Sequence, residues 1–228
     1  MAMEIESAGE KSTEKRENLG RAGKLIVIAG RSGSGKDYLM DLMLNCDTAR
    51  EREVGRVVTC ASRTPRNGEQ HGVDYYFITQ DELFALHEQG ELVEEPVATG
   101  SSFKGTTKSE LSRVLEGYNL VWRIDLSRAA DVAGGDFFDR LFDKETAVVM
   151  RLSTVVILVD VDQETLIRRR QSRDGDLYDE KEYEERDRQE LQILAEFGDK
   201  FNHTIENRDD ETEQTKKMLE ELLCSFLD

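Results

Sequence analysis

Three short, uninterrupted apolar runs stand out along the chain: KLIVIAG at 24–30, NLVWRID at 119–125 and STVVILVDV at 153–161. Runs of this length without alternation are typical of strands buried on both faces, as in a parallel sheet. Mixed apolar and charged spacing predicts helices at 36–45, 107–118, 163–173, 180–198 and 211–227. Because strands alternate with helices, we expect an α/β fold in which helices cover both faces of a parallel sheet, giving three layers.

Residues 57–106 follow a different pattern. Short alternating segments, RVVTCAS, VDYYFIT and ELVEEPVAT, surround one helical stretch, DELFALHEQ. This pattern predicts a small lobe inserted into the main sheet. The segment SRDGDLYDEKEYEER at 172–186 is charged, contains a glycine and lies between two predicted helices. We interpret it as a mobile cover.

Composition narrows the class of protein. The 228 residues suffice for one domain with inserted lobes, and no apolar run reaches the length of a membrane span. Residues 1–22 mix acids and bases and lack the apolar core of a signal peptide. We therefore expect a solvated tail and a cytosolic protein. Cys46, Cys60 and Cys224 form no C-x-x-C pair, so reduced thiols are expected. The net charge of -17 disfavours general binding to nucleic acid.

The strongest local signal is AGRSGSGKD, which follows a predicted strand and opens a predicted helix. It fits the phosphate-binding pattern G-x-x-x-x-G-K-[ST] from Gly30 to Lys36. Glycines let successive N–H groups point at phosphate oxygens, and the helix dipole and Lys36 add positive potential. The candidate phosphate ligands are Gly30, Arg31, Ser32, Gly33, Ser34, Gly35 and Lys36. The alternative is a glycine-rich turn that binds nothing.

Asp37 occupies the position where this pattern has a hydroxyl. A carboxylate ~5 Å from a phosphate costs on the order of 3 kcal/mol in repulsion at an effective dielectric constant near 20. A magnesium ion between the two would reverse the sign, because carboxylates are ordinary magnesium ligands. We therefore expect Asp37 to bind Mg²⁺ in place of the hydroxyl. An acid in the first turn of a helix is also favourable through the helix dipole alone.

A second motif, SRTPRNGEQHGVDYYF, spans 62–77. Arg63 and Arg66 flank a stiff Thr-Pro pair, so two planar donor forks can converge on one oxyanion, and Tyr75 offers a third donor. Taken alone, the motif also fits a surface loop with solvated arginines. The spacing R-x-P-R-x-G-E-x-x-G-x-D-Y resembles the acceptor signature of guanylate kinases. Together with the glycine loop upstream, the resemblance covers about residues 24–228.

The resemblance implies a P-loop nucleoside monophosphate kinase fold with a parallel-sheet core, a small GMP-binding lobe and a helical lid. On this basis we predict a domain at 23–228, with the lobe at 57–106, the lid at 172–198 and the core at 23–56, 107–171 and 199–228. The implied reaction converts GMP, and dGMP with it, to the diphosphate with ATP and Mg²⁺. The expected partners are ATP and GMP, without nucleic acid or membrane, for a monomer or homodimer.

Residue roles follow from the same resemblance. The expected GMP ligands are Thr59, Arg63, Arg66, Tyr75, Glu94, Thr106 and Asp125. Guanine presents N1–H and N2 donors that carboxylates accept, although Glu94 also fits an exposed charged pair. The expected ATP ligands outside the loop are Arg169 and Asn207, and the lid arginines that neutralise the transferred group are Arg169, Arg173 and Arg186. Arg168 and Arg170 fit a solvated basic helix face.

The chain departs from the family pattern at several positions. Asp37 replaces the loop hydroxyl, and Arg31 stands where the family usually has proline. A second phosphate-binding tyrosine is missing, and Phe103 and Lys104 occupy its region. Arg123 replaces the first member of an Asp-x-Asp pair, and we interpret Asp37 as compensating for that lost acid. Residues 132–152 exceed the usual connection and have no predicted role.

Two other functions fit parts of the sequence. Ribosyl bisphosphate kinases, which phosphorylate ribose 1,5-bisphosphate, resemble this chain in carrying SGSGKD with the same aspartate. The arginine motif, Glu94 and Asp125 favour a guanine nucleotide instead. Guanylate-kinase-like domains of scaffold proteins bind proteins without catalysis and have lost the ATP loop. Because Gly30, Gly35 and Lys36 are present here, we expect an enzyme.

Overall fold

The structure of the chain is a computed structural model that describes residues 22–209 and 212–227. The chain folds as two compact units: the larger contains Gly23–Gly55 and Tyr118–Asp228, and the smaller contains Arg56–Gly117. The predicted tail, apart from Ala22, lies outside the described residues. The smaller unit continues to Gly117, whereas the lobe predicted from the sequence ends at residue 106.

The larger unit is built on a five-stranded sheet in the order β2-β7-β1-β8-β9. The strands are β1 (Leu25–Gly30), β2 (Gly55–Arg56), β7 (Leu120–Arg123), β8 (Thr154–Asp160) and β9 (His203–Glu206). β1 pairs in parallel with β7 and β8, and β8 pairs in parallel with β9. Every residue of β1 is buried, because neighbours cover both its faces. The three apolar runs are therefore confirmed as strands of a parallel sheet.

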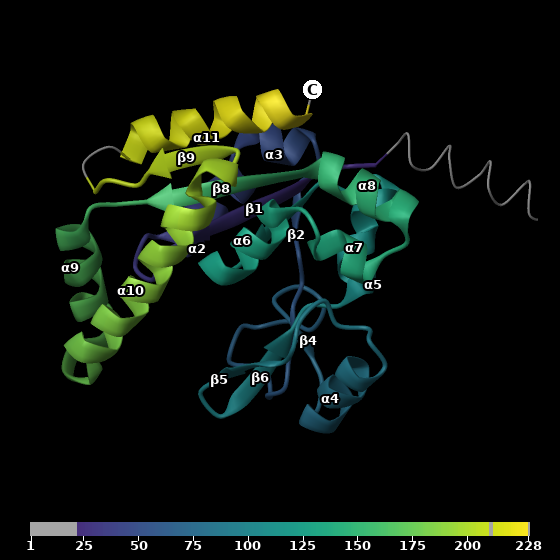
Figure 1. Cartoon of the computed structure of the whole chain (residues 1–228), viewed down its shortest axis with the longest axis horizontal. Helices are drawn as coiled ribbons and strands as arrows, with labels where there is room; N and C mark the ends of the chain where they lie inside the picture. Colours follow the sequence, from purple (N-terminus) through teal and green to yellow (C-terminus); the bar gives the residue numbers. More distant parts are fainter. Residues whose placement is uncertain (1–21, 210–211, 228) are drawn as a thin grey trace, which may run out of the picture. The chain divides into compact units, whose positions relative to one another are not determined.

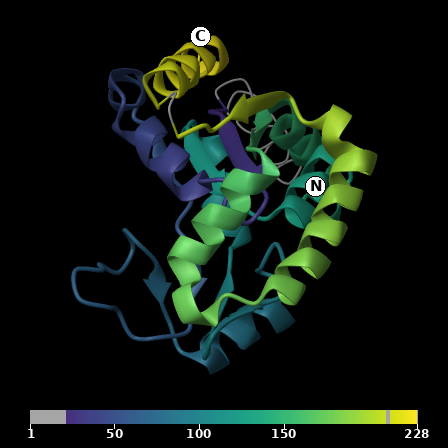
Figure 2. The same ribbon diagram turned by 90° about the vertical axis from the view of Figure 1, so that its left-hand side faces the viewer.

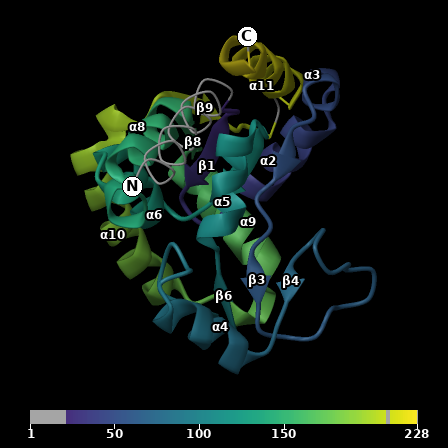
Figure 3. The ribbon, with the colours of Figure 1, turned by 90° about the vertical axis from the view of Figure 1, so that its right-hand side faces the viewer.

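Helices lie on both faces of this sheet, as predicted (Figure 3). One face is covered by α2 (Lys36–Asn45), α3 (Asp47–Glu51) and α11 (Thr212–Leu227). The other is covered by α6 (Leu126–Gly134), α7 (Phe137–Leu141) and α8 (Lys144–Ser153), and α10 (Glu180–Phe197) packs on α6. On the first face, Ile26 and Ile28 of β1 pack with Leu39 of α2 and Leu219 of α11. All four of these side chains are buried.

Residues 132–152, which had no predicted role, form the end of α6, all of α7 and most of α8. The pattern was missed because a glycine pair separates α6 from α7 and α7 has only five residues. Gly135 ends α6 with a left-handed φ of 100°, and the Asp143 side chain caps α8 by accepting from the Thr146 N–H. Phe137 and Phe138 are fully buried, so the segment adds a hydrophobic layer beside the sheet. The predicted helix at 107–118 is shorter and consists of α5 (Lys108–Ser112) and the 3-10 turn η1 (Arg113–Glu116).

Two helices project from the sheet of the larger unit, α9 (Gln163–Asp174) and α10 (Figures 1 and 2). They are joined at the end remote from the sheet through the 3-10 turn η2 (Gly175–Leu177). The Asp162 side chain caps α9, and the Asp179 side chain caps α10. The segment predicted to be a mobile cover is largely helical, and its mobility stays a prediction.

The smaller unit contains a four-stranded sheet in the order β4-β3-β6-β5. Its strands are β3 (Cys60–Ala61), β4 (Tyr76–Phe77), β5 (Val97–Thr99) and β6 (Ser102–Gly105), with α4 (Gln80–Glu88) packed on β6. Thr79 and Glu82 form a capping box at the start of α4. The strands are shorter than the alternating segments of the sequence, and β6 was not predicted. Cys60, Leu83 and Leu92 form the core of this unit.

Candidate active site

The glycine loop joins β1 to α2, as its pattern predicts. Gly35 is the N-cap of α2 with a left-handed φ of 90°, and no side chain caps the helix. The first N–H groups of α2 therefore lack the side-chain acceptor that most helix starts have. The Asn207 amide closes the back of the loop by donating to the Ser34 carbonyl at 2.7 Å. This arrangement offers uncapped N–H groups to an anion.

Gly35→Ala is expected to destabilise the larger unit, because a Cβ at Gly35 would lie 2.1 Å from Asn207 Nδ2. The left-handed φ adds strain on the order of 1 kcal/mol. Gly68→Ala is the matched control, since Gly68 has the same φ of 90° and a Cβ added there would meet no atom within 4 Å. Denaturant unfolding of both variants separates the clash from the backbone strain. Equal losses of stability would contradict a steric role for Asn207.

Lys36 turns back over the loop. Its Nζ donates to the Gly30 carbonyl at 2.5 Å and to the Arg31 carbonyl at 3.0 Å. Burial lowers the pKa of Lys36 to about 8, Glu190 opposes this shift, and the charges of Arg123 and Arg186 add to it. The lysine is thus a partly desolvated cation close to both arginines and acids, and groups with strongly shifted pKa values cluster at functional sites.

The three predicted lid arginines have different surroundings. Arg169 donates to the Ser34 carbonyl at 3.2 Å and to the Asn207 carbonyl at 2.8 Å, so it reaches the loop. Arg186 pairs with Glu190 at 3.1 Å, and its charge acts on Lys36. Arg173 pairs with Asp174 at 2.8 Å, and both contact the Tyr183 hydroxyl.

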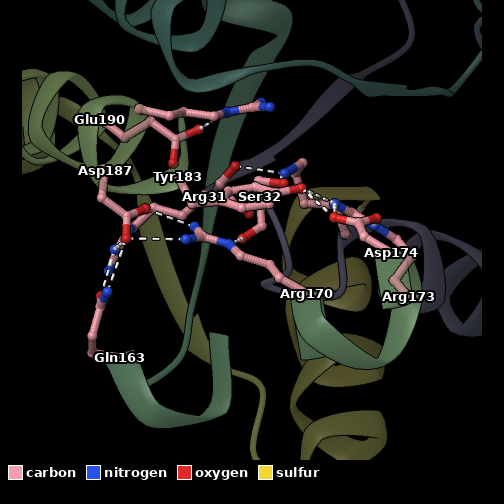
Figure 4. Close-up of polar contacts among 12 residues, drawn as sticks. Arg31, Ser32, Gln163, Arg170, Arg173, Asp174, Tyr183, Asp187 and Glu190 are labelled. Atoms are coloured by element: carbon pink, nitrogen blue, oxygen red, sulfur yellow. Dashed lines mark hydrogen bonds and ion pairs between the residues drawn. The ribbon is translucent and has the colours of Figure 1, made fainter. Parts of the chain in front are cut away.

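Arg170 is fully buried, so its interpretation as part of a solvated helix face is wrong. Its guanidinium forms two hydrogen bonds to Asp187, at 2.7 and 3.0 Å, and its Nε donates to the Ser32 carbonyl at 2.8 Å. The same carboxylate pairs with Arg31 at 2.9 Å and accepts from Gln163 at 2.8 Å (Figure 4). Asp187 therefore ties the loop to α9 and α10. Sequence reasoning missed it because its partners are distant along the chain.

Asp37 and Arg123, the two departures that we related to each other, form an ion pair. Asp37 Oδ1 lies 2.9 Å from Arg123 Nε. No group of three or more His, Cys, Asp or Glu side chains suited to a metal ion occurs in the described parts of the chain. A magnesium ion on Asp37 would sit beside a guanidinium, so this arrangement does not fit direct ligation. Asp125, expected at the guanine, caps α6 by accepting from the Arg128 N–H at 2.9 Å.

In the smaller unit, Arg63 lies among groups from the same motif. Its guanidinium makes two hydrogen bonds to Glu69, at 2.6 and 2.7 Å, and lies over the Tyr75 ring at 5.2 Å. The hydrogen bond from Arg63, followed by that from the Arg66 N–H, lowers the pKa of Glu69 to about 2. Lys104 donates to the Tyr75 hydroxyl at 3.0 Å. The structure thus brings together Arg63, Tyr75 and Lys104, while the Arg66 side chain is exposed.

Glu94 and Thr106 also lie together, because the Thr106 N–H donates to Glu94 Oε1 at 3.1 Å. Thr59 is next to β3, and its carbonyl accepts from the Tyr76 N–H at 3.0 Å. Glu110 was missed by sequence reasoning although it is buried. It accepts from the Val58 N–H at 3.0 Å and from Arg113 at 2.7 Å. One acid within a short helix has no sequence signature that marks it as buried.

Comparisons with known proteins agree with these features. Residues 22–133 match the family model described as guanylate kinase. Guanylate kinase 2, chloroplastic/mitochondrial, of Oryza sativa subsp. japonica is 36% identical over 135 residues, which cover 56% of this chain and 45% of the relative. Guanylate kinase of Porphyromonas gingivalis is 34% identical over 110 residues, covering 48% and 57%. The chain thus spans about half the length of the curated relatives it matches.

The fold has a counterpart among solved structures. The crystal structure of guanylate kinase from Anaplasma phagocytophilum has a TM-score of 0.53 and covers 91% of this chain and 87% of its own, at 20% identity. The parallel sheet with helices on both faces is therefore shared with that structure, which confirms the predicted fold class. The glycine loop and the arginine motif both fall inside the matched segment 22–133. Over that segment, this chain is similar to guanylate kinases.

Proposed function

We propose that the chain transfers a phosphoryl group from ATP to GMP, and to dGMP, giving ADP and the nucleoside diphosphate. The main observation behind the proposal is the position of Lys36, which is partly desolvated and donates to the Gly30 carbonyl. It lies at the start of α2, which no side chain caps. The arginine motif in the same matched segment supplies the acceptor side of the proposal.

On the donor side, the loop N–H groups and Lys36 hold the outer phosphates, with Arg169 at the loop and Arg186 beside Lys36. The GMP phosphate is largely dianionic at neutral pH, so the reaction needs no general base. One of its oxygens attacks the γ-phosphorus as the bond to the ADP oxygen breaks. These residues position the groups and neutralise their charge. Lid closure by α9 and α10 would keep water from accepting the phosphoryl group.

On the acceptor side, Arg63, Arg66 and Tyr75 bind the GMP phosphate, and Glu94, Thr106, Thr59 and Asp125 bind guanine. The Glu69 carboxylate already holds Arg63 through two hydrogen bonds, which keeps the guanidinium ordered before GMP arrives. Lys104 Nζ, 3.0 Å from the Tyr75 hydroxyl, supplies the donor that a second tyrosine would give. A lysine brings charge without the fixed geometry of a phenol.

Magnesium is expected from the family resemblance as the ion that accompanies ATP. The described residues build no three-ligand acidic or imidazole cluster for it, so we propose that it arrives with the nucleotide. None of the described helices is both long and apolar enough to cross a membrane. The three cysteines are unpaired, which supports our proposal of a cytosolic location.

The test is a coupled ADP-release assay with GMP, dGMP, AMP, UMP and ribose 1,5-bisphosphate as acceptors. We expect ADP with GMP and dGMP. A response to ribose 1,5-bisphosphate without a response to GMP would contradict the proposal and favour a small-molecule kinase. Release of no ADP with any acceptor would favour a protein-binding module.

Arg63→Lys is expected to raise the KM for GMP and leave the KM for ATP unchanged. A lysine keeps the charge but loses the planar fork that binds a phosphate through two hydrogen bonds. Losing one charged hydrogen bond corresponds to roughly a tenfold rise or more. Steady-state kinetics with each substrate varied in turn measures both constants. An equal rise in both KM values would contradict a role confined to the acceptor.

A further inference from the structure

Arg123 lies at the edge of the sheet from which the glycine loop begins. It is the last residue of β7, and the parallel register places it opposite Ile28 of β1. The Ile124 N–H donates to the Ile28 carbonyl at 3.1 Å, so the backbone beside Arg123 is fixed to the strand that leads into the loop. Parallel strands present their carboxyl ends to bound ligands. Arg123 therefore stands at the ligand-facing edge of the sheet.

Asp37 holds the guanidinium in place. The 2.9 Å contact to Asp37 Oδ1 uses the Nε of Arg123, and the four N–H groups on its two terminal nitrogens are not part of that contact. Asp37 is the second residue of α2 and follows Lys36 directly. The pair is exposed to solvent, with 35% of the Arg123 side chain and 74% of the Asp37 side chain accessible. An incoming anion can thus reach the terminal nitrogens.

The charges around Lys36 point to an anion at this position. Arg123 and Arg186 both act on Lys36 as neighbouring positive charges, and Glu190 and Asp37 act on it as negative charges. The Asp37 carboxylate alone would repel a phosphate at the loop. Paired with Arg123, its charge is balanced, and Lys36 remains as the surplus cation at the loop. The carboxylate that looks unfavourable in the sequence is thus offset by a residue from another strand.

We infer that Arg123 binds the triphosphate of the nucleotide donor and that Asp37 is the positioning residue that aims its guanidinium at the loop. This inference rests on the proposed function and deepens it. It assigns to Asp37 a role other than direct magnesium ligation, because a guanidinium already neutralises that carboxylate. Arg123 supplies positive charge where the Asp-x-Asp pair of the family would have an acid.

The inference is tested first without catalysis. Calorimetry with inorganic triphosphate in the absence of divalent metal measures the phosphate site of the whole chain. We expect Arg123→Gln to weaken binding roughly tenfold or more, the size of a lost charged hydrogen bond, and Arg123→Lys to weaken it less. Asp37→Asn should weaken binding less than Arg123→Gln, because Asp37 acts through Arg123. The double variant should bind no more weakly than Arg123→Gln, because it also lacks the unpaired carboxylate that would repel the anion. Arg140→Gln, which removes another Asp-paired arginine, is the control and should bind as the wild type does.

Kinetics separates this inference from the proposed function. Arg123→Gln should change the KM for ATP or kcat while the KM for GMP stays within about twofold. Unchanged triphosphate binding in Arg123→Gln would overturn the inference even if the chain phosphorylates GMP. Binding that depends on Arg123 in a chain that releases no ADP would overturn the proposed function and support the inference. A higher magnesium requirement in Asp37→Asn, absent from Arg123→Gln, would make Asp37 a metal ligand and overturn it.

Discussion

Replacing Lys36 with methionine is expected to lower the rate of ADP formation with GMP roughly a hundred- to a thousandfold, the range for losing one transition-state-stabilising donor. The lysine is the cation nearest the loop carbonyls, with Nζ 2.5 Å from the Gly30 carbonyl. Charge on the transferred phosphoryl group is neutralised by positioned cations, so a neutral side chain of similar length removes that stabilisation. Steady-state kinetics at saturating GMP measures the effect.

The same substitution should leave the free energy of unfolding at pH 7 no lower than in the wild type. Burial lowers the pKa of Lys36 from 10.5 to about 8, so the folded chain holds this proton less tightly than the unfolded chain. That shift opposes folding by ~3 kcal/mol below pH 8, and its effect fades as the pH rises to 10.5. Methionine has no such charge. Any stability advantage of Lys36→Met should therefore shrink across this pH range.

Lys217→Met on α11 serves as the control, because Lys217 is exposed and pairs with Glu221 at the surface. It should change neither turnover nor stability measurably. Lys36→Arg tests whether charge alone suffices, since an arginine keeps the charge with a different shape. Full turnover in Lys36→Met would refute the role of Lys36 in the reaction. Unfolding of Lys36→Met would instead show that the lysine is required for the fold.

The sheet could be predicted from the sequence because burial on both faces leaves a local signature. β1, β7 and β8 are uninterrupted apolar runs, and α2 begins at Lys36 as the glycine loop requires. Helices α7 and α8 left no such signature, since α7 has only five residues and α8 buries only a few side chains such as Met150. In the smaller unit, strands of two residues are too short for alternation to mark their ends.

The parts of the site that could be predicted are those whose residues lie in one continuous segment of the sequence. The loop from Gly30 to Lys36 and the arginine motif around Arg63 are continuous in sequence, and their pattern has a physical reason. The pair formed by Asp37 and Arg123 was not predictable as a contact, because parallel strand order alone brings β7 beside β1. Comparing the chain with the family pattern related these two residues to each other but indicated metal chemistry rather than a salt bridge.

Asp187→Asn is expected to destabilise the larger unit by about 3 to 5 kcal/mol, the range for removing one partner of a buried ion pair. Arg170 and Arg31 are both buried, and the Asp187 carboxylate pairs with each of them. An asparagine would leave two buried guanidinium groups without a counter-charge. Denaturant unfolding measures the loss, and Glu185→Gln is the control on the same helix, because Glu185 is exposed and should change stability by less than about 0.5 kcal/mol.

Acid should remove part of this stabilisation from the wild type. Burial alone would raise the pKa of Asp187, but hydrogen bonds from Arg170, Gln163 and Arg31 outweigh it and lower the pKa to about 2. Because the folded-state pKa lies below the ordinary value of 3.8, the contribution is present above pH 4 and is lost as the pH falls towards 2. It amounts to ~2 kcal/mol. The stability difference between wild type and Asp187→Asn should shrink across that range.

A triple variant, Arg31→Met with Arg170→Leu and Asp187→Leu, removes all three charges of the network at once. It tests whether the network is needed only to balance buried charges or also to hold the loop in place against α9 and α10. Apolar groups of similar volume often replace a buried ion network without loss of stability. We expect this variant to recover most of what Asp187→Asn loses, although the Ser32 carbonyl gives up its hydrogen bond from Arg170. Triphosphate affinity should stay below that of the wild type, because the loop is no longer tied to α9 and α10. Recovery of both stability and affinity would show that the network is dispensable for the site, and recovery of neither would contradict the charge-balance account.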